Sequence, residues 1–356
     1  MDGFVHDVPA SRVLFGAGSR RQVPGEVDRL GRRRVLLVAG ARQREHADEL
    51  ATALGPKVAG RVHEVAPHVP APDAARTAAM AHELAADLLV CIGGGSATGL
   101  AKAVALRTGL PILAVATTYA GSEASPIWGV TEHGRKVTGR DRAALPVVAV
   151  YDPELTLSLP PDVSAASGMN ALAHLVEGLY APDASPVTLL LAEEGVRALV
   201  DALPRVVAAP ADPAARADAL YGAWLAGSVL GTVTMGLHHK VCHVLGGTYD
   251  LPHAGTHSAV LPFVAAFNAR SAPDAMARLR RALGTAAEPA RGLHELAAGI
   301  GAPTSLAAVG FDAERIDEAA RLVAAQRPVN PRDVDEPAVR ELLRAAHAGE
   351  LEYEPA

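Results

Sequence analysis

Residues 86–107 read ADLLVCIGGGSATGLAKAVALR, an apolar stretch that leads into three consecutive glycines and then into an alanine- and leucine-rich segment. Residues 86–92 are typical of a strand buried on both faces, and residues 96–107 are typical of a helix. Glycines at such a junction let the backbone approach a ligand closely, and a helix N-terminus favours negative charge. The stretch therefore predicts a strand–turn–helix unit suited to the pyrophosphate of a dinucleotide.

Strands and helices continue to alternate on both sides of this stretch. Further strands are expected at residues 12–15, as an edge strand, and at 34–38, 111–116 and 147–151, with a helix at 43–54. Short apolar strands separated by helices indicate a parallel sheet that is covered on both faces. We therefore predict that residues 1–158 form a doubly wound α/β domain.

The second half of the chain has a different pattern. Residues 159–356 show helical periodicity and almost no strand signal. Long helices are expected at residues 165–180, 186–203 and 214–244, and a surface loop is expected at 207–215. We predict an all-α domain here, with the domain boundary near residue 158.

Composition argues against several classes of protein. The formal net charge of −6 argues against a nucleic-acid-binding surface, which is normally basic. There is no run of about 18 apolar residues, and the N-terminal sequence lacks the basic and apolar regions of a secretory signal. Cys91 and Cys242 are expected to be free, buried thiols in a reducing compartment. We expect a cytoplasmic homodimer without a nucleic-acid or membrane partner.

Residues at the ends of neighbouring strands extend the candidate cofactor site. The carboxyl ends of parallel strands meet at one edge of a doubly wound sheet, where the ligand binds. The expected cofactor contacts are Gly93, Gly94, Gly95, Ser96, Thr117, Thr118 and Gly40. No carboxylate follows the strand before Gly40 to bind a ribose 2′-hydroxyl, and Arg42 could pair with a 2′-phosphate. Both NADH and NADPH are therefore candidate cofactors.

Three polar residues share one face of a predicted helix in the second half. In the segment SGMNALAHLVE, residues 167–177, Asn170, His174 and Glu177 have i, i+4 and i+7 spacing. Such a polar face on an otherwise apolar helix indicates a site rather than a core contact.

A group of histidines follows further along the chain. His239 and His243 form a second i, i+4 pair, after which the helix is expected to stop at Gly246 and a loop to carry His253 and His257. Five of the 14 histidines lie between residues 238 and 257. A single core histidine needs no function, but this density on two helices and a loop predicts a functional site.

Taken in chain order, these motifs are similar to those of the iron-containing alcohol dehydrogenases, over nearly the whole chain. The matching segments are Gly93 to Ser96, Thr117 to Glu123, Tyr151-Asp152-Pro153, Asn170 with His174 and Glu177, and His239 with His243 and His253. The resemblance implies a dinucleotide-binding N-terminal domain, a helical C-terminal domain and a site between them. It also implies that an aspartate, here replaced by Asn170, holds a divalent iron or zinc together with the residues matching His174, His239 and His253.

The departures from the family pattern carry functional information. Asn170 replaces the only anionic ligand, so metal affinity should fall, although three imidazoles can still bind zinc. Gly99 stands where alcohol-dehydrogenase relatives usually have aspartate. The segments around Gly99, Glu123, Pro126, Lys136 and Leu251 resemble the maleylacetate reductase branch, whereas Ala116 and Gly255 depart from it.

This branch implies NAD(P)H-dependent reduction of the conjugated double bond of maleylacetate to 3-oxoadipate, in the degradation of aromatic compounds. We expect His174, His239, His243 and His253 to form a cationic pocket that binds a dicarboxylate and stabilises an enolate oxygen. His243 or His253 is the candidate proton donor, and Lys136 is a candidate contact for a carboxylate or the cofactor.

Three alternatives remain open from the sequence. The first is a metal-dependent alcohol dehydrogenase that acts on a small aldehyde. The second is a lyase or cyclase on the same scaffold, as in the related dehydroquinate synthases. The third is a non-catalytic binding protein, which is disfavoured because the glycine turn and the histidines occur together.

Overall fold

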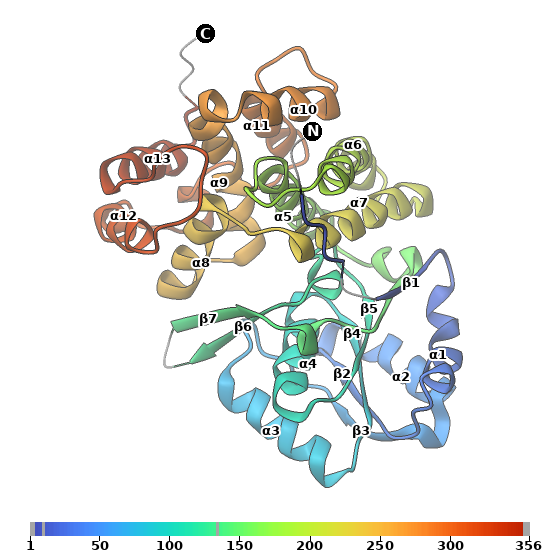
Figure 1. Ribbon diagram of the computed structural model, residues 1–356. Coiled ribbons are helices and arrows are strands. Elements are labelled where there is room, and N and C mark those ends of the chain that lie inside the picture. The colour runs from blue at the N-terminus through green and yellow to red at the C-terminus, as the bar shows by residue number, and fades with distance from the viewer. Residues whose placement is uncertain (1–3, 9–10, 133–134, 352–356) are drawn as a thin grey trace. The chain divides into compact units, whose positions relative to one another are not determined.

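The computed structural model describes residues 4–8, 11–132 and 135–351 and divides into two compact units (Figure 1). The α/β unit holds Val8–Leu159 and Ala211–Leu220, and the helical unit holds Pro160–Pro210 and the described residues on either side of it, from Tyr221 onward and before Val8. The predicted single boundary near residue 158 therefore does not describe this division fully. Residues 211–220, which include the start of helix α7 (Pro213–Thr232), belong to the α/β unit although they lie beyond that boundary.

A six-stranded, fully parallel sheet forms the centre of the α/β unit, with the order β1-β8-β5-β4-β2-β3. The strands are β1 (Arg12–Phe15), β2 (Val35–Ala39), β3 (Val58–Val62), β4 (Leu88–Gly93), β5 (Ile112–Ala116) and β8 (Val148–Tyr151). Helices α1 (Val23–Arg29) and α2 (Arg44–Leu54) pack on one face, and α3 (Ala71–Glu83) and α4 (Gly95–Thr108) pack on the other. The predicted doubly wound α/β fold is confirmed.

Two features of this unit do not follow from hydrophobic periodicity. Strand β3 contains a glycine and an arginine and is half-buried at the sheet edge, so its sequence lacks the apolar run of the central strands. Strands β6 (Ile127–Glu132) and β7 (Arg135–Arg140) form a separate antiparallel hairpin. Lys136 lies in this hairpin, paired with Thr131.

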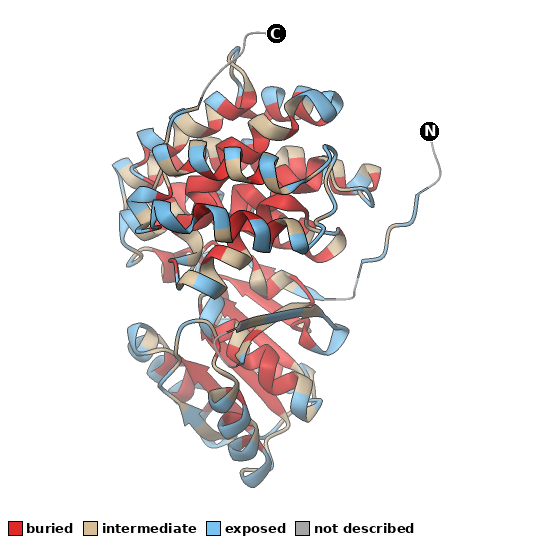
Figure 2. Cartoon of the chain, turned by 90° about the vertical axis from the view of Figure 1, so that its left-hand side faces the viewer, coloured by how far each residue is buried: buried red, intermediate tan, exposed pale blue. Residues whose placement is uncertain are grey.

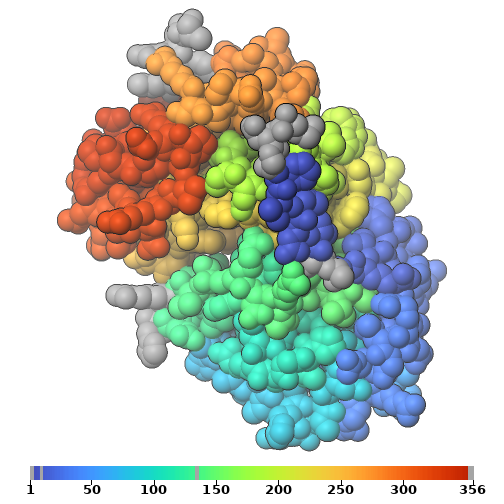
Figure 3. All heavy atoms as spheres, viewed as in Figure 1, coloured from blue at the N-terminus to red at the C-terminus, as the bar shows by residue number. Residues whose placement is uncertain are grey.

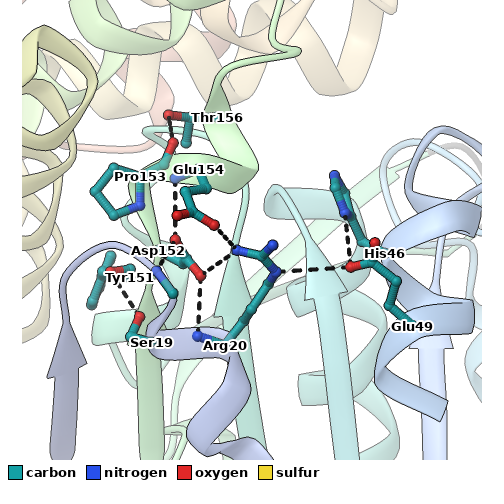
Figure 4. Close-up of polar contacts among 10 residues, drawn as sticks. Ser19, Arg20, His46, Glu49, Tyr151, Asp152, Pro153, Glu154 and Thr156 are labelled. Carbon is teal, nitrogen blue, oxygen red and sulfur yellow. Dashed lines mark hydrogen bonds and ion pairs between the residues drawn. The ribbon is translucent and has the colours of Figure 1, made fainter. Parts of the chain in front are cut away.

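A buried carboxylate fastens two turns at the carboxyl edge of the sheet (Figure 4). Asp152, directly after β8, accepts hydrogen bonds from the backbone N–H groups of Gly18 (3.0 Å), Arg20 (3.1 Å) and Glu154 (3.1 Å). The Arg20 guanidinium adds a fourth donor at 2.9 Å. The Tyr151-Asp152-Pro153 motif therefore joins the turn after β8 to the turn after β1, because a fully buried carboxylate requires such donors.

The helical unit is built around two central helices. Its helices are α5 (Pro161–Leu179), α6 (Pro186–Ala208), α8 (Leu237–Tyr249), α9 (His253–Asn268), α10 (Pro273–Leu283), α11 (Pro289–Gly299), α12 (Ile316–Ala325) and α13 (Glu336–Ala348), together with the end of α7. Most residues of α5 and α9 are buried, as the red ribbons in Figure 2 show. The N-terminal segment lies against this unit (Figure 3), where His6 Nδ1 is 2.8 Å from Ser185 Oγ.

The single helix expected over residues 214–244 is wrong. Helix α7 ends at Thr232, α8 begins at Leu237, and the two are bent by 97°. The intervening backbone is held by side chains from elsewhere, because Asp183 accepts the N–H of Thr234 at 2.9 Å and Glu177 accepts the N–H of Gly236 at 3.1 Å. These are tertiary contacts, which local periodicity does not encode.

The expected end of the next helix at Gly246 is also wrong. Helix α8 continues to Tyr249 and ends at Asp250, which adopts a left-handed φ of 54°. Helix α9 begins at His253, so His253 and His257 lie on its first turns rather than in a loop. The loop expected at 207–215 is shorter than predicted, since α6 reaches Ala208 and α7 begins at Pro213.

Among the described residues, no single helix has both the length and the hydropathy needed to cross a membrane. Only the bent pair α7 and α8, taken together, meets the length and composition test.

Candidate active site

The glycine turn between β4 and α4 is packed too closely to carry side chains. A Cβ atom on Gly94 would lie 2.8 Å from the Thr118 side chain, and one on Gly93 would lie 2.7 Å from the Cβ of Ala97. Gly93 also has a positive φ of 156°. The structure thus brings the turn against Thr118, as the sequence predicted, and it requires glycine at both positions.

The N-terminus of α4 presents its first backbone N–H groups without a side-chain cap. Gly95 and Ser96 are its first two residues and both are exposed. Thr117 adds a buried hydroxyl that has no partner among the described residues, while its N–H donates to the carbonyl of Gly93 at 3.1 Å. Free N–H groups at a helix N-terminus suit a phosphate, so this turn fits a dinucleotide pyrophosphate.

Gly40 has a different environment from the glycine turn. It follows β2 with an ordinary φ of −75°, and a Cβ atom there would make only an ordinary contact, 3.9 Å from Val65. The structure therefore gives no steric reason for glycine at this position. Arg42 is exposed nearby, in the 3-10 helix Ala41–Gln43.

A buried lysine that sequence reasoning missed braces the same region. Lys102, on the inner face of α4, donates hydrogen bonds to the carbonyls of Ser125 and Ile127, both at 2.7 Å. Burial lowers the pKa of this lysine to about 7, with partial compensation from the charge of Glu123. The contacts join α4 to the segment that leads into β6, and the surrounding alanines and valines gave no sign of a buried charge.

The helical unit gathers the predicted histidines from three helices. His174 Nδ1 on α5 lies 2.8 Å from His239 Nε2 on α8. The ring centroid of His243 is 6.1 Å from that of His239. On α9, the rings of His253 and His257 are 4.5 Å apart, and His257 is 5.0 Å from His239. Residues separated in the sequence therefore form one cluster, as predicted.

Glu177 lies beside this cluster and determines which ring nitrogen of His239 carries a proton. Its carboxylate accepts the N–H groups of Gly236 (3.1 Å) and His238 (2.8 Å), and it lies 2.5 Å from His239 Nδ1. A carboxylate only accepts, so His239 Nδ1 must carry a proton. The 2.8 Å contact between His239 Nε2 and His174 Nδ1 then shares a single proton between two imidazoles.

A second, deeper group consists of His238, Cys242 and His257, of which the sequence analysis counted the two histidines in the predicted group but gave none of the three a role. His238 Nε2 is 3.0 Å from His257 Nδ1 and 3.7 Å from Cys242 Sγ. Burial, assisted by neighbouring imidazoles, lowers the pKa of both histidines well below the usual 6.5, so both rings are neutral. The i, i+4 spacing of His238 and Cys242 was the available sequence signal.

Two family models cover most of the chain. The model described as iron-containing alcohol dehydrogenase matches residues 10–153, and the model of the C-terminal part of that family matches residues 164–347. The chain belongs to the iron-containing alcohol dehydrogenase family. It is therefore an oxidoreductase.

Several relatives in the iron-containing alcohol dehydrogenase family are similar over their full length. The chain is 53% identical to the maleylacetate reductase of Sphingobium indicum, over 97% of this chain and 98% of the relative. The crystal structure of maleylacetate reductase from Agrobacterium tumefaciens superposes with a TM-score of 0.94 at 46% identity, covering 98% of this chain and 99% of that one. A putative alcohol dehydrogenase from Ralstonia eutropha gives a TM-score of 0.97 at 49% identity, covering 98% and 99%.

The position at which the family resemblance places an iron or zinc ion lacks the anionic ligand of the family pattern. Asn170 contributes a neutral amide, and its buried Oδ1 has no partner among the described residues. Two of the three imidazoles, His174 and His239, already satisfy each other. Because no ligand at this position is anionic, we expect a divalent ion to be held more weakly here, although three imidazoles can still bind zinc.

Restoring the missing charge should create an iron site. Removing a residue that hydrogen-bonds to a metal ligand typically lowers metal affinity about 10–100-fold. Residue 170 is itself at a ligand position, so Asn170→Asp should raise the affinity for ferrous iron by at least that factor. Anaerobic iron titration with chelator competition measures this, and Asn170→Ala is the matched control. Equal iron binding by the parent and the aspartate variant would show that the charge of residue 170 does not decide metal affinity.

The neutral pair His238 and His257 predicts acid-sensitive stability. In the unfolded chain these imidazoles protonate near pH 6.5, whereas the folded chain keeps them neutral, so the unfolded chain binds more protons as the pH falls. Stability that is present above pH 6.5 should be lost below it, by about 1.4 kcal/mol per pH unit for each ring. Denaturant unfolding of chelator-treated protein measures this, and His257→Gln should show a shallower loss. Parallel curves for parent and variant would contradict the assignment.

Proposed function

We propose that this chain reduces maleylacetate, or a similar small oxo-dicarboxylate, to 3-oxoadipate with NADH or NADPH. The observation that carries the proposal is a histidine cluster without an anionic metal ligand, in a chain similar over its full length to maleylacetate reductases. We further propose a cytoplasmic homodimer that acts in the degradation of aromatic compounds.

The glycine turn of the α/β unit would hold the cofactor. The exposed N–H groups of Gly95 and Ser96 bind the pyrophosphate, and Thr117 and Thr118 supply hydroxyls beside it. When bound, the nicotinamide supplies a hydride. Since no carboxylate follows β2, the site discriminates weakly between NADH and NADPH.

The substrate's charge matches the groups that the helical unit presents. Reducing a double bond conjugated to a ketone leaves negative charge on the ketone oxygen, and the substrate brings two carboxylates. Glu177 orients His239, which in turn contacts His174, so the two imidazoles form a fixed hydrogen-bonding pair for the developing oxyanion. The N-terminus of α9, whose N-cap Pro252 supplies no side-chain acceptor, adds further N–H donors. Asn170 and Gly255 place no carboxylate near these donors to repel the substrate.

Accessibility separates the candidate proton donors from the supporting histidines. His174 and His239 are each 4% exposed, whereas His243 and His253 are only partly buried. A proton donor must reach the substrate's α-carbon, so His243 and His253 fit this role and the buried pair fits oxyanion stabilisation. Lys136 remains a candidate contact for a carboxylate or the cofactor.

The glycine turn gives a direct test of the cofactor assignment. Gly94→Val would force a side chain against Thr118 and displace the backbone from the pyrophosphate. Losing one hydrogen bond to a charged group costs about 1.5–3 kcal/mol, so the dissociation constant for NAD(P)H should rise about tenfold or more. Cofactor fluorescence titration measures the change, alongside a thermal melt to confirm folding.

Gly25→Ala is the matched control, because a Cβ atom at Gly25 meets nothing within 4 Å. The control should bind NAD(P)H as the parent does. A folded Gly94→Val variant with unchanged affinity would remove the glycine turn from the cofactor site.

The histidine roles are tested by turnover of maleylacetate in His253→Ala and His243→Ala. Loss of an oxyanion donor typically costs about 10²–10³ in turnover, and loss of a general acid costs about 10²–10⁴. Single-turnover kinetics, NAD(P)H affinity and melting temperature are measured together, with small aldehydes as comparison substrates. His347, which donates to the carbonyl of Phe311 at 3.0 Å, is the structural control.

His347→Ala should lower the melting temperature and leave turnover near normal. Full rates in both His253→Ala and His243→Ala would exclude them as donors. Aldehyde reduction that exceeds maleylacetate reduction in the parent would instead favour the alcohol dehydrogenase alternative.

A further inference from the structure

We propose that His238, Cys242 and His257 form a binding site for one thiophilic cation of the zinc class. This site shares no ligand with the position defined by Asn170, His174, His239 and His253. The three side chains come from adjacent turns of α8 and from α9, and their exposed fractions are 0%, 1% and 0%. The site therefore lies in the dry interior of the helical unit.

Two of the three distances between the ligand atoms are close to those of tetrahedral coordination. The three atoms lie within 4.8 Å of one another. Zinc bonds of about 2.0–2.1 Å to nitrogen and about 2.3 Å to sulfur require about 3.3 Å between two nitrogens and about 3.5 Å between sulfur and nitrogen. The observed separations are 3.0 Å for His238 Nε2 to His257 Nδ1 and 3.7 Å for His238 Nε2 to Cys242 Sγ. These two separations lie within a few tenths of an ångström of the tetrahedral values.

Both imidazoles are free to present a lone pair to the ion. The outward nitrogens, His238 Nδ1 and His257 Nε2, have no partner among the described residues. In this they differ from His239, whose Nδ1 is held by Glu177. Each ring can therefore carry its proton on the outward nitrogen, which leaves His238 Nε2 and His257 Nδ1 as ligands.

The thiol supplies the anionic ligand that the Asn170 position lacks. Cys242 is not in a disulfide, and a coordinating thiol is deprotonated by the ion. One thiolate with two imidazoles selects zinc-like ions over magnesium or calcium.

An ion at this site would fasten the two helices that carry the proposed proton donors. Cys242 directly precedes His243 on α8, and His257 lies one turn after His253 on α9. Occupancy would therefore fix the spacing between α8 and α9 next to both histidines. Metal binding itself does not depend on the proposed reaction.

Cobalt(II) gives a direct test, because a thiolate ligand produces a near-ultraviolet charge-transfer band that imidazole and amide ligands do not. Chelator-treated protein titrated with cobalt(II) should develop this band with one equivalent per chain. Cys242→Ser should abolish the band, while Cys91→Ser, which removes the only other cysteine, should keep it. His253→Ala should also keep it, since His253 belongs only to the other position.

A second variant and a second measurement guard against misfolding. His257→Gln should keep the band but weaken cobalt affinity, and zinc should raise the melting temperature of the parent more than that of either Cys242→Ser or His257→Gln. Circular dichroism confirms that the variants are folded. Absence of the band in the parent, or its persistence in Cys242→Ser, would overturn the site.

Discussion

The buried carboxylate of Glu177 is the group on which the helical unit's site depends. It accepts the N–H groups of Gly236 and His238, which start α8 after a 97° bend, and it holds His239 Nδ1. The same carboxylate therefore fixes the direction in which α8 begins and places a proton on Nδ1 of His239. Without it, buried N–H groups would be left without acceptors, which costs about 1–3 kcal/mol each.

Buried charges play a comparable role in the α/β unit. Asp152 collects four donors and joins the turns after β1 and β8. Lys102 joins α4 to the segment before β6. Neither group occupies the exposed glycine turn, yet both hold the loops around the carboxyl edge of the sheet. The loops beside the glycine turn, which we propose binds the cofactor, are therefore held by buried polar groups.

The anionic side chain that contacts the histidine cluster is Glu177, whereas residue 170 carries no charge. Residue 170 is an amide, so the imidazoles of His174 and His239 pair with each other and with Glu177 rather than with a carboxylate ligand at position 170. At the cation site that we propose, the thiol of Cys242 would supply a negative ligand from a neighbouring, deeper set of side chains. The proposed function therefore relies on hydrogen bonds from imidazoles, rather than on a metal ion, to stabilise charge on an anionic substrate.

The sequence by itself determined the fold class, the glycine turn and the set of histidines. Apolar strands, consecutive glycines between a strand and a helix, and i, i+4 pairs are local patterns. The β4–α4 unit and the polar face of α5 could therefore be predicted from the sequence. Strand β3 and the β6–β7 hairpin were not predicted from the sequence, because their residues are half-exposed and show no regular hydrophobic periodicity.

Only the tertiary structure decided where α7 ends, that His253 starts a helix, and that Lys102 and Cys242 lie beside the predicted site residues. Each of these depends on a contact between distant residues: the break before α8 is stabilised by Asp183 and Glu177, and the deep group needs α9 to bring His257 to α8. Local propensity has no access to such contacts, because a buried polar group is acceptable only when its partner arrives from elsewhere in the chain.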